Sequence, residues 1–246
     1  MKKYLLALCC VWAAGQCLAQ ETTKMTRDTG LFREKFEVLK SDPKIKQGKY
    51  AFSVISSGKI LTSGFYKNNK KDGLWDEYNN AGYVVAEGKY ADGKKVGVWN
   101  YYGKMWVEDN KYDFTKNQLT YHRGVKTDST FVYQVVKGKD TINTIMERPP
   151  VYLGGTDLMD RALIYNLHYP AQAVAAGVNG RVTIVFTVDE HGRTRDYKVA
   201  QSLGHGLDEE ALRVVKSIPD DWVAGTLSGK PVATIIRIPV AFKTKK

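Results

Sequence analysis

The residues of this 246-residue chain best suited to chemistry are its histidines, its serines and one run of acids. The histidines stand in unrelated contexts without the spacing of a metal site, and no serine sits in a nucleophile elbow. They are His122, His168, His191 and His205. The acids Asp208, Glu209 and Glu210 open a predicted helix, whose positive end favours them. The pattern predicts no enzyme, no metal site and no cofactor.

The first nineteen residues predict export. Lys2 and Lys3 precede a mostly apolar run at 4–15, and Ala19 closes a short small-residue pattern. This is typical of a signal peptide over residues 1–19, cleaved after Ala19. The alternative is an uncleaved anchor. All three cysteines lie inside this segment, so the exported chain would have no disulfide and no thiolate site.

The bulk composition is that of a globular protein with a basic surface. The formal net charge is +11, and 43% of the residues are hydrophobic. A basic excess is compatible with nucleic acid, anionic membranes or acidic partners. Because the lysines are spread along the whole chain and no nucleic-acid-reading motif accompanies them, we expect no nucleic-acid role.

A repeat with a period of 24 residues occupies the first half of the chain. Its two clear copies share a Gly-x-Tyr step, a lysine pair, a glycine, a tryptophan and a tyrosine. These are Gly64, Tyr66, Lys70, Lys71, Gly73, Trp75, Tyr78 and Gly88, Tyr90, Lys94, Lys95, Gly97, Trp99, Tyr102. Asn68-Asn69 and Asp92-Gly93 are hairpin turn signals. The pattern predicts a ladder of hairpins that stack their aromatic residues on one another.

This repeat resembles the MORN-type repeats of bacterial envelope proteins, over residues 48–112. The resemblance implies a structural spacer or a surface for protein contact, with the aromatic residues in the core. We assign the hairpin-repeat region to residues 48–145. Before it, residues 20–47 are expected to form a loose leader or a short helix. A β-rich stretch at 129–136 reads as a worn final repeat or a linker, and Pro149-Pro150 marks the domain boundary.

The last third of the chain predicts an α+β domain with a small antiparallel sheet. Helices are expected at 158–167, where Thr156-Asp157 is a candidate cap, at 171–176 and at 207–215. Strands are expected at 181–188, 194–201 and 232–243.

Particular residues in this order closely resemble the TonB C-terminal domain, over residues 149–243. They include Tyr169-Pro170, Gly180-Arg181-Val182, Phe186-Thr187-Val188-Asp189, Gly192, Leu207-Asp208-Glu209-Glu210-Ala211, Trp222, Gly229-Lys230-Pro231-Val232 and Ile238-Pro239-Val240. The chain departs from the family after Trp222, where a proline is usual. It also carries hairpin repeats in place of a long Pro-rich spacer.

The resemblance implies a periplasmic protein that binds a short extended peptide of an outer-membrane TonB-dependent receptor by strand addition, in energy transduction or transport. If the N-terminus is an inner-membrane anchor, an inner-membrane motor complex is a further partner. The alternative is an untethered periplasmic scaffold or adaptor that contacts other envelope proteins. The partner-binding residues that the resemblance implies are Asn166, Leu167, His168, Val232, Thr234, Ile236, Arg237 and Ile238.

Overall fold

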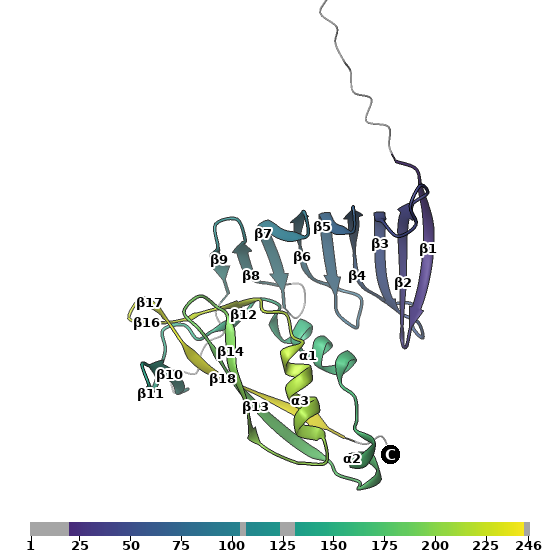
Figure 1. The fold of residues 1–246 in the computed structure, drawn as a ribbon. Coiled ribbons are helices and arrows are strands. Elements are labelled where there is room, and N and C mark those ends of the chain that lie inside the picture. Colours follow the sequence, from purple (N-terminus) through teal and green to yellow (C-terminus); the bar gives the residue numbers. More distant parts are fainter. Residues whose placement is uncertain (1–19, 104–106, 124–130, 244–246) are drawn as a thin grey trace, which may run out of the picture.

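The computed structural model describes residues 20–103, 107–123 and 131–243, so the predicted signal peptide lies outside the described residues. The described chain has two parts: a nine-stranded antiparallel sheet, and a C-terminal domain of helices on a smaller sheet (Figure 1). This confirms the predicted fold class. Within these ranges, no helix has the length and apolar character needed to span a membrane.

The nine strands of the first sheet lie side by side in chain order, each antiparallel to the next (Figure 1). They are β1 (Thr22–Thr29), β2 (Phe32–Leu39), β3 (Lys46–Val54), β4 (Ile60–Lys67), β5 (Lys70–Tyr78), β6 (Val84–Ala91), β7 (Lys94–Tyr102), β8 (Glu108–Asp113) and β9 (Gln118–His122). The predicted turns join β4 to β5 and β6 to β7. Asn68, Asn69, Asp92 and Gly93 all have positive φ there, as a tight two-residue hairpin turn requires.

The 24-residue period has a physical cause in the packing of tryptophan on glycine. The Trp75 ring lies across Gly64 of β4, and the Trp99 ring lies across Gly88 of β6. A Cβ atom at either glycine would stand 2.3 Å from the ring, so only glycine fits. Each indole N–H also donates to a carbonyl of the strand that it crosses, at 3.0 Å. The repeat is therefore a packing unit, as predicted.

The predicted leader is instead a β-hairpin that extends the sheet. β1 and β2 pair along their whole length, from Thr22 opposite Leu39 to Thr29 opposite Phe32. Gly30, with φ of +58°, forms the two-residue turn with Leu31. The spacing of the apolar residues suggested a helical face, but β2 pairs with β3 as well as with β1, and this pairing fixes it as a strand.

The C-terminal domain places helices against one face of a five-stranded sheet. Its helices are α1 (Gly155–Asn166), α2 (Ala171–Ala175) and α3 (Leu207–Lys216). The sheet has the order β11-β10-β18-β13-β14, from strands β10 (Tyr133–Lys137), β11 (Asp140–Thr144), β13 (Gly180–Val188), β14 (Thr194–Gln201) and β18 (Thr234–Phe242). Two small ribbons complete it: β12 (Val151–Tyr152) with β15 (Trp222–Val223), and β16 (Gly225–Leu227) with β17 (Lys230–Val232).

The core of this domain lies between α3 and the two longest strands. Val182, Ile184 and Phe186 of β13 and Ile238 and Val240 of β18 are buried against α3. This is the alternation of a sheet with one covered face. The predicted core residues Phe186 and Trp222 meet edge to face, with ring centroids 5.6 Å apart. The predicted helix cap at Thr156-Asp157 is wrong: α1 begins at Gly155 after Gly154, and no side chain caps it.

A further correction concerns residues between the two parts. The predicted repeat region at 48–145 includes β10 and β11, yet these strands join the sheet of the C-terminal domain. Val135 of β10 is buried there, opposite Thr234 of β18. The repeat sheet instead ends at His122 of β9. Sequence pattern alone marks β10 as a strand but does not say which sheet it enters.

The two parts pack against each other through polar and apolar contacts. The Arg161 guanidinium of α1 donates to the carbonyls of Leu61 and Tyr78, at 2.6 and 2.7 Å, and pairs with the Glu77 carboxylate. Leu153 is buried in the aromatic cluster around Trp75 and Trp99. We call the sheet face that carries these two tryptophans the inner face, and the opposite one the outer face.

Candidate functional site

The edge of β18 is the candidate site for partner binding, and its own chain covers part of it. On one side β18 pairs with β13 along its whole length, from Thr234 opposite Val188 to Phe242 opposite Gly180. On the other side β10 pairs with its beginning only, at Thr234 and Ile235. Among the described residues, no strand pairs with the rest of that side. The open edge therefore runs from Ile236 to Phe242.

The pairing determines which backbone groups face the open side. The Val136 N–H donates to the Ala233 carbonyl, so every second residue after Ala233 directs its N–H and C=O away from β13. On the open edge these residues are Arg237, Pro239 and Ala241. Proline has no N–H, so an added strand would lack one hydrogen bond there. The edge thus offers donors at Arg237 and Ala241 only.

The predicted edge residues divide between three positions. Arg237 is exposed on the open side, and its guanidinium donates to the Gln134 side chain at 2.8 Å. Thr234, Ile236 and Ile238 belong to β18, but their backbone groups face β13 and their side chains point toward the core. Val232 lies outside β18, in the ribbon β17 opposite Gly225.

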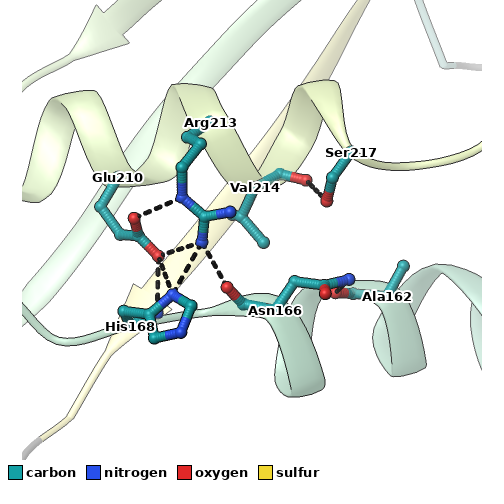
Figure 2. Close-up of polar contacts among 7 residues, drawn as sticks. All are labelled: Ala162, Asn166, His168, Glu210, Arg213, Val214 and Ser217. Carbon is teal, nitrogen blue, oxygen red and sulfur yellow. Dashed lines mark hydrogen bonds and ion pairs between the residues drawn. The ribbon is translucent and has the colours of Figure 1, made fainter. Parts of the chain in front are cut away.

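Asn166 and His168 of the predicted segment Asn166, Leu167, His168 are held against α3 (Figure 2). The Glu210 carboxylate accepts from the His168 backbone N–H at 2.5 Å and from the Arg213 Nε at 2.8 Å. The Arg213 guanidinium also donates to the Asn166 carbonyl. Leu167 packs on the core, whereas the His168 side chain is 79% exposed. The segment is fixed in position with one side chain presented to solvent.

The hydrogen bonds that Glu210 accepts favour the ionised form of its carboxylate. Burial opposes ionisation of Glu210, but hydrogen bonds from the Arg213 side chain and the His168 N–H outweigh it and lower the pKa of Glu210. The next residue, Tyr169, meets Phe242 at the end of β18 edge to face, with ring centroids 5.7 Å apart. The structure therefore brings the Asn166–His168 segment to the C-terminal end of the open edge.

Three residues at this site lie outside the sequence prediction: Gln134, Glu210 and Arg213. The sequence assigns Glu210 only to the start of a helix, because the helix dipole already accounts for an acid there. The sequence holds a signal for Gln134, since the β-rich stretch at 129–136 that contains it has neither the glycines nor the tryptophan of the 24-residue repeat. No group of metal-ligating side chains occurs among the described residues. The arrangement offers backbone donors and acceptors that an added strand can pair with.

The geometry defines a class of small α+β domain in which helices cover one face of an antiparallel sheet and a strand edge stays partly open. Residues 165–244 match the family model of the Gram-negative bacterial TonB protein C-terminal domain. The chain thus carries a TonB-like C-terminal domain, which confirms the resemblance read from its motifs. This is a family of protein-interaction domains of the cell envelope.

Comparison with solved structures gives partial matches. The solution structure of the Helicobacter pylori TonB C-terminal domain is 26% identical, with 36% of this chain and 78% of that chain covered and a TM-score of 0.27. The crystal structure of TarM is 10% identical, with 41% of this chain and 21% of that chain covered and a TM-score of 0.25. No curated protein sequence matches the chain.

Proposed function

We propose that this chain is a TonB-like periplasmic protein whose C-terminal domain binds an extended segment of an outer-membrane TonB-dependent transporter, in energy transduction or transport across the envelope. The observation that carries the proposal is the open edge of β18, where no strand of the described chain pairs with the outward backbone groups of Arg237 and Ala241. An incoming strand would satisfy these groups. The fixed Asn166–His168 segment beside Phe242 would contact the end of the bound peptide.

The test uses a synthetic peptide from the plug of such a transporter and the isotope-labelled full chain. We expect the amide resonances of Arg237 and Ala241 to shift on titration more than those of Ile236 and Ile238, whose N–H groups already face β13. Shifts confined to β14, the opposite edge of the same sheet, would contradict the proposal.

A matched pair of variants isolates the backbone contribution. Arg237→Ala removes the side chain and its contact with Gln134 but keeps the N–H. Arg237→Pro removes the N–H as well, and Pro239, two residues along, shows that β18 accepts proline in this register. We expect the proline variant to bind about tenfold more weakly than the alanine variant. Equal affinities would exclude pairing at this edge.

The second candidate function is an untethered adaptor without an energy-coupling role. It is favoured by the way the repeat sheet is joined to the domain: Arg161 pairs with Glu77, and Lys95 pairs with Asp221. A protein of this kind holds two surfaces in a fixed relation. The N-terminal mass and membrane fraction of the native protein separate the candidates. A start at Gln20 in the soluble fraction favours the adaptor, and an intact Met1 in the inner membrane favours transduction.

A further inference from the structure

The outer face of the repeat sheet is separate from the candidate peptide edge and is left uncovered by the C-terminal domain, which packs on the inner face. The strand registers place one row of side chains straight across it. From β2 to β7 the row reads Lys35, Ala51, Ser63, Asp76, Glu87 and Asn100, each directly opposite the next. Basic, small and acidic residues therefore follow one another in order across the sheet.

Apolar side chains stand beside this row. Leu74 is 60% exposed, Val98 47% and Phe65 46%, which is unusual for large residues grouped on one face. Two hollows, of about 590 and 490 Å³, adjoin each other because Leu74 and Asp76 line both. The floor of the first includes the small residues Ala51 and Ser63. The face thus has apolar ridges next to a shallow depression.

The charges of this face are grouped largely by sign, with Glu37 and Lys89 as the exceptions. Lys24, Lys35 and Lys49 line the first hollow on its β1 to β3 side, and none of them forms an ion pair among the described residues. Glu37 also lies at this end, and its carboxylate accepts from the Lys49 N–H. Asp76 and Glu87 stand opposite each other over β5 and β6, again without an ion pair in the described chain, and Lys89 lies beside them. Burial, and next the repulsion from Glu87 and Glu77, raise the pKa of Asp76 despite its contact with Tyr78.

We propose that the outer face is an interface between two copies of this chain, related by a two-fold axis that runs parallel to the strands over β4. This operation exchanges β2 with β6 and β3 with β5 across the axis. It sets Lys35 opposite the partner's Glu87, and Ala51 opposite the partner's Asp76. Phe65 lies near the axis. One face that carries both a basic and an acidic half is self-complementary in the way that a two-fold interface requires.

The size of the face indicates a reversible association. Seven strands about 4.8 Å apart, paired over about 20 Å of strand length, give a footprint of roughly 600 Å² on each copy. Stable complexes bury about 800 Å² per partner. The two sheets would stack face to face about 10 Å apart with their strands nearly aligned. We therefore expect a dimer that forms at micromolar concentrations and weakens as salt screens the paired charges.

The test is sedimentation of the full chain from low micromolar to near-millimolar concentration, with two complementary charge-reversed variants. K35E with K49E makes both halves of the face acidic, and D76K with E87K makes both basic. We expect each variant alone to self-associate at least about tenfold more weakly than the unaltered chain, and an equimolar mixture of the two to form a heterodimer. K137E with K198E, at two exposed lysines of the C-terminal domain, changes the net charge as K35E with K49E does and should leave the dimer intact.

The mixture makes the outcome decisive, because a variant that fails to fold cannot regain association by mixing. Leu74→Asp is a second probe: its side chain is largely exposed, so thermal unfolding of the monomer should be unchanged while the dimer is lost. A chain that stays monomeric over the whole range overturns the proposal. So does a dimer that survives both charge reversals, or a mixture that remains monomeric.

Discussion

The two parts of the molecule bury their hydrophobic residues in different ways. Within its described residues the repeat sheet has no helix, and Trp75 and Trp99 are each buried by crossing a glycine of the preceding strand. The C-terminal domain instead covers its sheet with α3, whose Leu207, Ala211 and Val214 are fully buried. The first arrangement joins residues about ten positions apart in the chain, whereas the second joins β13 to β18 across some fifty residues.

This difference determines how each part responds to change. In a sheet of repeats each unit rests on its immediate neighbours, so damage at one tryptophan affects adjacent hairpins first. In a two-layer domain the helix and the strands share one core and are lost together. The contacts of Arg161 and Leu153 connect the repeat sheet to the C-terminal domain, so they couple the unfolding of one part to that of the other. Four changes test whether this description holds.

The largest expected effect is the loss of a crossing tryptophan. Trp99 is 1% exposed, and Trp99→Ala should lower the free energy of unfolding by about 3–5 kcal/mol. The loss should appear in hydrogen exchange first at β6, β7 and β8, and only later at β13. Val98→Ala, next to it on the outer face, should cost about 0.5 kcal/mol or less. Equal and simultaneous loss of protection in both parts would show that they form one cooperative unit.

Next in size is removal of the arginine that joins the two parts. Arg161→Ala leaves two carbonyls and the Glu77 carboxylate without their donor, and should cost about 2–4 kcal/mol. Calorimetry should then resolve two unfolding transitions in place of one. Arg195→Ala removes only an exposed pair with Asp196 and serves as the control. A single unchanged transition in the Arg161 variant would mean that the apolar contacts at Leu153 suffice.

A smaller effect concerns the hairpin that covers the start of the β18 edge. Val135 is 3% exposed, and Val135→Asp should release β10 from β18 because a buried carboxylate has no partner there. If the domain binds an extended peptide as proposed, its affinity should rise about tenfold, since a competing strand is removed. Ile142→Asp, on the exposed strand β11 opposite Val135, is the matched control. Unchanged affinity in the Val135 variant would show that the peptide does not use this end of the edge.

The smallest effect is a loss of stability in acid. Burial opposes ionisation of Asp189, but hydrogen bonds from the backbone N–H groups of Arg193 and His191 and from the Arg193 side chain lower its pKa. A group with a lowered folded pKa stabilises the fold above its unfolded pKa, and that contribution disappears as the pH falls through the folded value. Stability should therefore be level near neutral pH and decline below about pH 4.

The matching variants are Asp189→Asn and Asp140→Asn. Asp189→Asn removes the turn carboxylate, so the free energy of unfolding should fall in acid by about 1 kcal/mol less than in the unaltered chain. Asp140 lies at the exposed tip of the β10–β11 hairpin, and its variant should titrate like the unaltered chain. An Asp189 variant with the same acid profile would show that other carboxylates carry the dependence.

Sequence reasoning predicted the elements whose signals are local. Consecutive residues determine the Asp92-Gly93 turn and the alternation of buried and exposed side chains in β13. Strand β14 has the predicted bounds. The Gly–Trp spacing predicted the stacking of hairpins but not its cause, because the close contact of Gly88 with Trp99 is visible only in space. The sequence does not reveal the β1–β2 hairpin, because the spacing of Phe32 and Phe36 fits a helical face as well as a strand.

The candidate site was predictable only in part, and for a related reason. The family resemblance predicts Arg237 and the Asn166–His168 segment. In the structure, the contact of Tyr169 with Phe242 places this segment beside the end of β18, the strand that contains Arg237. The partial cover by β10 depends on pairing between residues about a hundred positions apart, at Gln134 and Ile235. Such a contact leaves no local pattern. Partner binding by these residues is the prediction that the peptide titration tests.

The contact of Trp99 with Gly88 also means that the width of the repeat sheet can change by whole repeats. Each 24-residue unit brings its own glycine, its own turn and its own tryptophan, so a copy can be added or removed without redesigning its neighbours. One unit contributes two strands and widens the sheet by about 10 Å. The distance from β1 to the C-terminal domain is thereby set in fixed steps, and duplication of a single hairpin is enough to change the reach of the protein by one step.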